Sequence, residues 1–372
     1  MNTRDKVEGI VIVAVESRGS ALPRGRIFGP FRDATGTGTH RRTATLFIHR
    51  GESIAMSESD PDVVVLRQTI HGSDARDLAA AIRERLPERT VAMARTPDEE
   101  RELLETARIA VGLHIDESQL AAAENLELFA CVFAGTGHLP RDALADHGVA
   151  VTNASGVHGP NISEYVVGAM VTHARQWQRA HRQQARREWR NYETTEVYGS
   201  TVAVVGLGAI GRTVVDRLAA FDVETIGVRY SPEKGGPTDE VYGFDAFHEA
   251  IADAEYVVLA CPLTAATRGL VDAEALRTMR SDAVLINVAR GPIVDTDALV
   301  SDLRNSRIRG AALDVTDPEP LPEDHPLWGL SNVTITPHNA GHTPHYYDRV
   351  AEILAENVRR LGAGDDLKNR VV

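Results

Sequence analysis

The segment between Thr201 and Phe221 constrains the fold more than any other part of this 372-residue chain. It starts with the apolar run Thr201 to Val205, continues with Gly206-Leu207-Gly208-Ala209-Ile210-Gly211, and ends in an alanine-rich stretch. A buried strand, a glycine turn and a helix are therefore expected in that order. This succession is typical of the first βα unit of a doubly wound, dinucleotide-binding sheet of the Rossmann type.

Each glycine of the pattern has a distinct expected role. Gly206 would allow the tight turn, Gly208 would let the backbone approach a pyrophosphate, and Gly211 would allow close packing of the helix on the strand. The N-terminus of that helix would face the phosphates. The alternative is a glycine turn that serves packing alone, and the surrounding strand and helix make it the less favoured interpretation.

The residues after the next strand bear on the choice of cofactor. The strand Glu224 to Val228 leads to the place where an NAD-binding unit would present a carboxylate to the ribose hydroxyls. Here that place holds Arg229, followed by Tyr230 and Ser231. Because a guanidinium can pair with a 2′-phosphate and stack on adenine, the residues favour NADP(H), with NAD(H) as the alternative. A solvated arginine beside a cofactor held by other contacts would explain the same residues.

Apolar runs and amphipathic stretches alternate along most of the chain. Strands are expected at 63–67, 90–94, 109–113, 126–133 and 149–152, with helices at 75–86 and 97–107 between the first of them. Such βα alternation predicts a parallel sheet covered by helices, of the flavodoxin-like kind. A long helix from Pro160 to Gln183 is expected to connect to the second unit, whose further strands would be 256–260, 283–288 and 308–313.

The first 55 residues differ from the rest. They carry a formal charge of +4, so the remaining residues carry −17, and no βα unit develops in them although Ile10 to Val15 could form a strand. Our hypothesis is that Met56 is the initiator and that residues 1–55 are an extension without a catalytic role. A basic arm that orders against the body or a partner is the alternative.

Composition excludes several classes of protein. The formal charge of −13 and the 43% of apolar residues exclude a disordered tail and a nucleic-acid module built on positive charge. Two distant cysteines argue against a disulfide scaffold or a metal site, and no apolar run is long enough for a membrane helix. We expect a soluble, cytoplasmic protein. Only three of the 40 basic residues are lysines, which suggests salt adaptation or GC-rich codon usage.

Four loops after the predicted strands carry a resemblance to a known family. They are Cys261-Pro262-Leu263-Thr264-Ala265-Ala266-Thr267, Asn287-Val288-Ala289-Arg290-Gly291-Pro292-Ile293-Val294-Asp295, Leu313-Asp314-Val315-Thr316-Asp317-Pro318-Glu319-Pro320-Leu321, and Thr336-Pro337-His338-Asn339-Ala340-Gly341. With the glycine pattern, they resemble the D-isomer-specific 2-hydroxyacid dehydrogenases from about Met56 to Val372. The resemblance implies a Rossmann domain, residues 154–340, inserted into a smaller flavodoxin-like substrate domain, residues 56–153 plus 341–372.

The resemblance also implies roles for three side chains. Arg290 corresponds to the family's arginine for the substrate carboxylate, His338 to its acid/base, and Glu319 to the carboxylate that partners the histidine. The residue types suit the reduction of a 2-oxo acid, because a guanidinium fork can hold a carboxylate and an imidazolium can protonate the carbonyl oxygen. Each residue taken alone would more often be a solvated charge, and their joint occurrence favours the functional interpretation.

Further residues correspond to family positions around the ligands. Cys261, Pro262, Thr267, Val288, Ala289 and Asp314 match loops along the cofactor, although Asp314 could simply anchor its loop and Pro262 and Thr267 could be turn residues. Gly135 and Thr136 match the loop whose backbone amides meet the substrate carboxylate, with a plain glycine turn as the alternative. Thr316 and Asn339 depart from the usual pattern, which could alter the shape of the pocket.

The expected function is an NADP(H)-preferring D-2-hydroxyacid dehydrogenase, or 2-oxoacid reductase, that acts on a small 2-oxo acid. No metal, nucleic acid or membrane is expected to take part, and the resemblance implies a homodimer. The alternative is a nucleotide-sensing regulator like the C-terminal binding protein corepressors, which would bind the cofactor and turn over small 2-oxo acids poorly.

Overall fold

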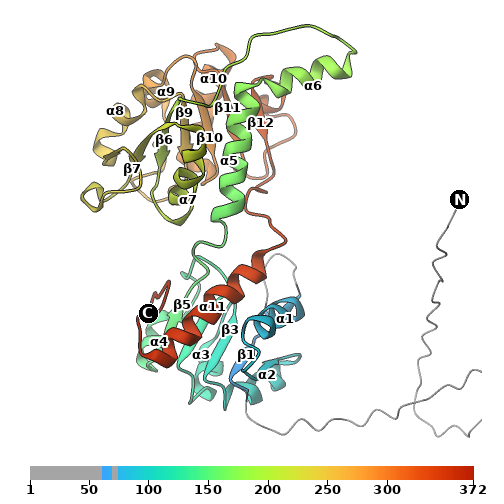
Figure 1. Ribbon diagram of the computed structural model, residues 1–372, viewed down its shortest axis with the longest axis vertical. Helices are drawn as coiled ribbons and strands as arrows, with labels where there is room; N and C mark the ends of the chain where they lie inside the picture. Colours follow the sequence, from blue (N-terminus) through green and yellow to red (C-terminus); the bar gives the residue numbers. More distant parts are fainter. Residues whose placement is uncertain (1–60, 69–73) are drawn as a thin grey trace, which may run out of the picture. The chain divides into compact units, whose positions relative to one another are not determined.

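The computed structural model describes residues 61–68 and 74–372 of the chain (Figure 1). The predictions about residues 1–55, Ile10 to Val15 and the role of Met56 lie outside the described residues. The described part contains two parallel sheets, one of five strands and one of seven. We call the first sheet with its covering helices the five-stranded body, and the second with its helices the seven-stranded body.

The five-stranded body is built on a parallel sheet in the order β2-β1-β3-β4-β5. Its strands are β1 (Val63–Val65), β2 (Val91–Met93), β3 (Ile109–Gly112), β4 (Leu128–Cys131) and β5 (Ala150–Thr152). Four of them are apolar and buried over most of their length, as expected for strands that are covered on both faces. This is the strand order of flavodoxin-like folds and confirms that prediction.

Helices cover both faces of this sheet. They are α1 (Ala75–Arg85), α2 (Pro97–Leu104), α3 (Glu117–Ala122), α4 (Arg141–Asp146) and α11 (Tyr346–Ala363). Leu78 and Ile82 of α1 share one apolar cluster with Leu354 of α11, and α2, α3 and α4 contribute to the cluster on the other face. Figure 1 shows α11, drawn in red, beside α1. The last long helix of the chain therefore completes the core of its first sheet.

The seven-stranded body is built on a parallel sheet in the order β12-β11-β10-β9-β6-β7-β8. Its strands are β6 (Thr201–Val205), β7 (Glu224–Val228), β8 (Glu240–Tyr242), β9 (Tyr256–Leu259), β10 (Val284–Asn287), β11 (Gly310–Leu313) and β12 (Val333–Ile335). The order reverses on either side of β6, which places a topological switch point between β6 and β9. The predicted Rossmann-type sheet is confirmed.

Helices also cover both faces of the second sheet. On one face lie α8 (Phe247–Ala252), α9 (Ala273–Thr278) and α10 (Thr296–Arg304), and on the other lie α5 (Gly159–Ala174) and α7 (Ala209–Leu218). Short 3₁₀ turns occupy residues 219–221, 232–234, 244–246, 291–293 and 326–329. The carboxyl ends of the strands carry the loops that the sequence singled out.

The single helix predicted from Pro160 to Gln183 is wrong. The structure has two helices, α5 and α6 (Trp177–Ala185), with Gln176 between them in the left-handed region at φ 51°. Arg175 ends α5, and its backbone N–H donates to the carbonyls of Val171 and His173. Because alanine, arginine and glutamine all favour helices, nothing in the local sequence marks this break.

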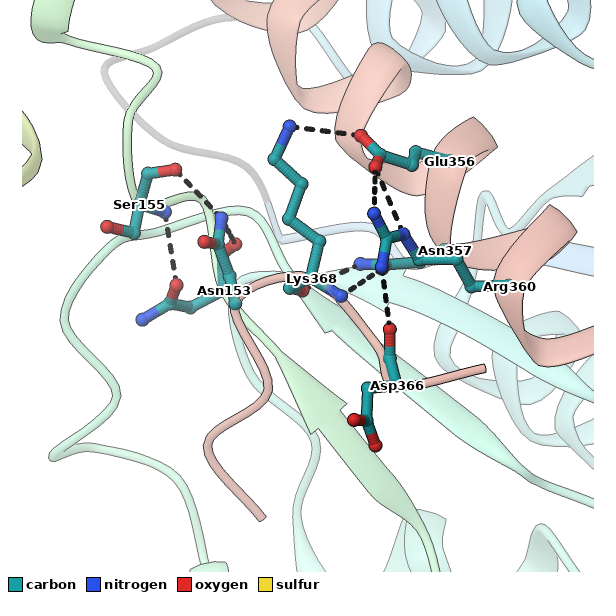
Figure 2. A network of polar contacts seen from close by, with 8 residues as sticks. Asn153, Ser155, Glu356, Asn357, Arg360, Asp366 and Lys368 are labelled. Carbon is teal, nitrogen blue, oxygen red and sulfur yellow. Dashed lines mark hydrogen bonds and ion pairs between the residues drawn. The ribbon is translucent and has the colours of Figure 1, made fainter. Parts of the chain in front are cut away.

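The end of the chain is fastened to the five-stranded body (Figure 2). Residues 370–372 run antiparallel to β5, since the Val371 N–H donates to the Val151 carbonyl at 2.8 Å. Asn357 of α11 exchanges two hydrogen bonds with the backbone of Lys368, at 2.7 and 3.0 Å. Glu356 binds both Arg360 and Lys368. The tail is thus held by side chains of α11 and by the edge of the sheet.

None of the helices within residues 61–68 and 74–372 combines the length and the apolar character that a membrane crossing requires.

Candidate active site

The glycine loop after β6 has the geometry that its sequence predicts. Gly206 has a φ of +102°, and a Cβ there would lie 2.6 Å from the Cα of Cys261. A Cβ on Gly211 would lie 1.9 Å from the carbonyl oxygen of Gly206, so helix α7 packs against the turn at a distance that excludes a side chain. Gly208, the N-cap of α7, has open space around it. The loop is therefore a tight cradle that leaves room beside the N-terminus of a ten-residue helix.

Arg229, Tyr230 and Ser231 follow β7, the strand that pairs with β6. The half-buried Arg229 guanidinium donates through one of its terminal nitrogens to the carbonyl of Gly235. Tyr230 is 83% exposed. Within the described residues no carboxylate forms an ion pair with Arg229. Its charge is therefore free to meet an anion beside the glycine loop.

The loop after β9 is closed by its own side chains. Thr267 is buried, and its hydroxyl donates to the carbonyl of Pro262 at 2.6 Å and accepts from the Thr264 N–H at 2.8 Å. Cys261 is also buried, and burial raises the pKa of its thiol to about 11. The thiol is accordingly neutral and unreactive near pH 7. Pro262 is exposed, so this loop presents backbone and proline rather than charge.

The loop after β10 places Arg290 at the surface. Val288 and Ala289 are buried, whereas Arg290 is exposed and donates to the carbonyl of Ala289 at 2.6 Å. The buried Asn287 side chain braces the turn, because it accepts from the Ala289 N–H and donates to the Arg290 carbonyl, both at 3.0 Å. Asn287 was within the motif but was not singled out from sequence. It fixes the backbone from which the Arg290 side chain extends.

His338 and Glu319 form a direct pair. The Nδ1 atom of His338 lies 2.7 Å from Oε1 of Glu319, and the two side chains are 48% and 42% exposed. A carboxylate can only accept, so Nδ1 carries the proton and Nε2 is left to exchange one with a ligand. The sequence-based pairing of these two residues therefore has the geometry that an oriented acid/base requires.

Asp314 holds the loop that carries His338. Its carbonyl accepts the His338 N–H at 2.8 Å, and its buried carboxylate accepts the N–H groups of Asn339 and Ala340 at 2.8 and 2.9 Å. The Thr336 hydroxyl donates to the same carboxylate at 2.6 Å and lies 2.9 Å from the hydroxyl of Tyr165. Burial raises the pKa of Tyr165 to about 12, so that hydroxyl stays protonated.

These bonds keep His338 in an unusual backbone conformation. Its φ is +52°, in the left-handed region that residues with a side chain rarely adopt. Such a conformation costs free energy of the order of 1 kcal/mol and persists where the surroundings enforce it. The four bonds to Asp314 supply that enforcement. The loop-anchoring role that the sequence left open for Asp314 is therefore seen directly, and Thr336 and Tyr165 join it as residues that sequence reasoning missed.

Gly135 and Thr136 lie on the five-stranded body, in the loop after β4. The Leu139 N–H donates to the Thr136 carbonyl at 3.2 Å, which bends the loop. Within residues 61–68 and 74–372, no acceptor binds the N–H of Gly135 or of Thr136. These two successive amides are therefore donors that the described protein groups leave unused, and a carboxylate can accept hydrogen bonds from such donors.

The remaining site residues gather at one edge of the seven-stranded sheet. Arg290, Glu319 and His338 follow the neighbouring strands β10, β11 and β12, and the glycine loop and Arg229 follow β6 and β7. Arg290 contacts its own loop and not the His338–Glu319 pair. No group of three or more His, Cys, Asp or Glu that could hold a metal occurs in the described part of the chain.

A glycine cradle at the switch point of a doubly wound sheet, with an imidazole–carboxylate pair at the same edge, is the arrangement of a dinucleotide-dependent dehydrogenase. Comparison with known proteins agrees. Residues 167–340 match the family model described as D-isomer specific 2-hydroxyacid dehydrogenase, NAD binding domain. A glyoxylate reductase from Thermofilum pendens is 36% identical over 261 residues, which are 68% of this chain and 76% of that protein.

A solved structure extends the likeness over both bodies. It is a D-isomer specific 2-hydroxyacid dehydrogenase from Xanthobacter autotrophicus in complex with NADPH and MES, 30% identical, with a TM-score of 0.66 over 84% of this chain and 98% of that chain. A D-3-phosphoglycerate dehydrogenase from Methanocaldococcus jannaschii is 32% identical, but this chain spans only 57% of its length. The chain belongs to the D-isomer-specific 2-hydroxyacid dehydrogenase family and is an NAD(P)-dependent oxidoreductase.

Proposed function

We propose that this protein is an NADP(H)-preferring 2-oxoacid reductase that acts in the D-2-hydroxyacid direction on a small substrate. The observation that carries the proposal is the 2.7 Å pair of His338 and Glu319, at the sheet edge that also presents Arg290 and the glycine cradle. Members of the family act on small 2-oxo and 2-hydroxy acids. Glyoxylate, pyruvate, hydroxypyruvate and short branched 2-oxo acids are the candidates.

The chain's residues meet the requirements of carbonyl reduction. The Arg290 guanidinium would leave the Ala289 carbonyl and hold the substrate carboxylate, which fixes the adjacent carbonyl group. A bound nicotinamide supplies the hydride when the substrate is reduced. As charge develops on the carbonyl oxygen, Nε2 of His338 would donate its proton there, and the neutral imidazole keeps its Nδ1 proton toward Glu319.

The described residues fit a phosphorylated dinucleotide. The open space at Gly208 and the N-terminus of α7 suit a pyrophosphate, with Leu207, Ala209, Ile210 and the loops at Cys261, Pro262, Thr267, Val288 and Ala289 lining the cofactor. Arg229, free of any carboxylate in the described part, would pair with a 2′-phosphate and stack on the adenine, with Tyr230 and Ser231 beside it. Asp314 would lie by the nicotinamide amide while it anchors the loop of His338.

Other predictions also stay proposals. We propose the domain division 56–153 plus 341–372 and 154–340, supported by the packing of α11 on α1.

We also propose a homodimer. It is supported by Trp177 and Trp189 in and after α6, which are 48% and 99% exposed, because large exposed aromatic side chains are enriched in protein interfaces. Sedimentation at several protein concentrations would test it, and activity that rises with added salt would support salt adaptation.

The test of function is the loss of absorbance of NADPH, and separately of NADH, with a panel of 2-oxo acids at low and high salt. Rapid oxidation of NADPH with one small acid and slower oxidation of NADH would support the proposal. Tight cofactor binding without oxidation by any acid would favour a nucleotide-sensing regulator. The corresponding 2-hydroxy acids, supplied as separate D and L isomers, would show the stereochemistry in the reverse direction.

A further inference from the structure

The Ala134 carbonyl, next to the two free amides, is fixed by a side chain from another segment. The Asn153 Nδ2 donates to this carbonyl at 2.7 Å, and the Ala154 N–H donates to the preceding carbonyl of Phe133 at 3.2 Å. A trans peptide is planar, with its N–H opposite its C=O. Holding the Ala134 oxygen toward Asn153 therefore fixes the Gly135 N–H in the opposite direction.

Asn153 is itself held in place from two sides. Its Oδ1 accepts the Ser155 N–H at 3.1 Å, which fixes the side-chain rotamer, and its N–H donates to the carbonyl of Asn369 at 3.2 Å. The Asn369 Nδ2 in turn donates to the carbonyls of Asn153 and Ser155, at 3.2 and 2.8 Å. Asn369 has a φ of +57°, and it contacts a segment more than 210 positions earlier in the chain.

The tail that presents Asn369 is anchored just before and just after it. Lys368 is bound through its backbone to Asn357 and through its ammonium to Glu356 (Figure 2). Val371 pairs with Val151 of β5. The contacts thus form one connected series, from α11 through the tail to Asn153, and from the Asn153 carboxamide to the Ala134–Gly135 peptide.

We propose that Asn153 is a positioning residue for substrate binding, and that the tail at Asn369 supports it. The site so positioned is the pair of amides of Gly135 and Thr136, and its ligand is the carboxylate of the 2-oxo acid. This inference rests on the proposed function. An amide that points correctly before the ligand arrives binds an anion more tightly, because no reorientation free energy is spent.

A role limited to stability would require only that Asn153 turn the chain between β5 and α5. Asn153→Asp separates the two roles. One aspartate oxygen can still accept the Ser155 N–H and keep the turn, whereas the other oxygen would face the Ala134 carbonyl and repel it. The substitution therefore removes the hydrogen bond to the Ala134 carbonyl, while the bond that fixes the turn at Ser155 is retained.

The experiment compares the steady-state kinetics of Asn153→Asp, Asn153→Ala, Asn369→Gly and wild type, with NADPH and the best 2-oxo acid. We expect the KM for the 2-oxo acid, and the inhibition constant of oxamate, to rise about tenfold both in Asn153→Asp and in Asn153→Ala, which adds no charge that could itself repel the substrate. The kcat and the KM for NADPH should change less than about threefold. Asn369→Gly keeps the left-handed backbone without strain and should raise the KM for the 2-oxo acid and the inhibition constant of oxamate about threefold.

Asn125→Ala is the matched control. Its carboxamide also donates to a backbone carbonyl of the five-stranded body, that of Glu105 at 3.0 Å. It forms no hydrogen bond with the loop after β4 that carries Gly135 and Thr136. An unchanged KM in Asn153→Asp, or an equal change in Asn125→Ala, would overturn the proposal. If an Asn153 variant does not fold, Asn369→Gly tests the proposal instead. An unchanged KM for the 2-oxo acid in that variant would then overturn it. A wild type that reduces no 2-oxo acid would instead overturn the proposed function, and the role of Asn153 with it.

Discussion

The two bodies share one architecture, and the proposed function gives them different parts of the chemistry. Both are all-parallel sheets with helices on each face, and both present loops at the carboxyl ends of their strands. On the seven-stranded body those loops carry Arg290, Glu319 and His338. On the five-stranded body the loop after β4 offers backbone amides instead. In the proposed mechanism, the seven-stranded body supplies the ionisable side chains that act on the substrate, while the five-stranded body supplies backbone hydrogen-bond donors to the substrate carboxylate.

The largest expected effect lies on the seven-stranded body. His338→Ala removes the group proposed to carry the proton, and we expect kcat to fall about 10²- to 10⁴-fold. Because the glycine cradle is not touched, NADPH binding measured by fluorescence or calorimetry should stay within about twofold of wild type. Turnover close to the wild-type rate would refute the role of His338.

A buried histidine of the seven-stranded body should make the stability of that body depend on pH in the acidic range. Burial of His173 in α5 lowers its pKa from 6.5 to about 4. Because the pKa of His173 is lower in the folded than in the unfolded protein, its contribution to the free energy of unfolding is fully present above pH 6.5. That contribution is lost as the pH falls toward 4. The loss is of order 3 kcal/mol in total. Urea unfolding between pH 7 and pH 4 should therefore be less steeply pH-dependent in His173→Gln. An identical pH dependence in both proteins would contradict this.

Arg290→Lys tests whether a positive charge is sufficient. Lysine keeps the charge and loses the planar fork that can bind a carboxylate through two nitrogens. We expect kcat/KM for the 2-oxo acid to fall about a hundredfold, with the KM for NADPH little changed. Arg304→Lys, at an exposed arginine that ends α10, is the control. A fall of less than about threefold would show that the fork is not used.

Arg229→Asp should reverse the cofactor preference. A carboxylate repels a 2′-phosphate and can accept from ribose hydroxyls. We expect the ratio of kcat/KM for NADPH to that for NADH to fall at least about tenfold, which corresponds to about 1.4 kcal/mol. The KM for the 2-oxo acid serves as the internal control. An unchanged ratio would show that Arg229 does not determine the preference between NADPH and NADH.

The smallest effect is expected on the five-stranded body. Thr136→Val removes a hydroxyl and keeps the backbone N–H that is proposed to bind the carboxylate. The KM for the 2-oxo acid should change less than about threefold, in contrast to the hundredfold effect at Arg290. A loss as large as that of Arg290→Lys would show that this loop also works through a side chain, and the division between the two bodies would fail.

Strand-rich parts of both bodies were predictable because buried parallel strands are continuous apolar runs. β8 and β12 were not predicted, since three residues such as Glu240–Tyr242 give no clear pattern. In the site, family motifs indicated the His338–Glu319 pair. The contacts of Thr336 with Tyr165 and of Asn369 with Ser155 join residues more than 170 positions apart. Ordinary hydroxyl and amide side chains carry no local signal of such partners.

The packing of α11 has a consequence for the order of folding. Tyr346, Val350 and Leu354 belong to the core of the five-stranded sheet, whose strands end at Thr152. The seven-stranded sheet needs only the continuous segment 201–335 for its strands. Contacts between residues distant in sequence form late because closing a long loop costs chain entropy. During synthesis, the five-stranded sheet, whose strands the ribosome makes first, can therefore complete its core only after α11 has been made.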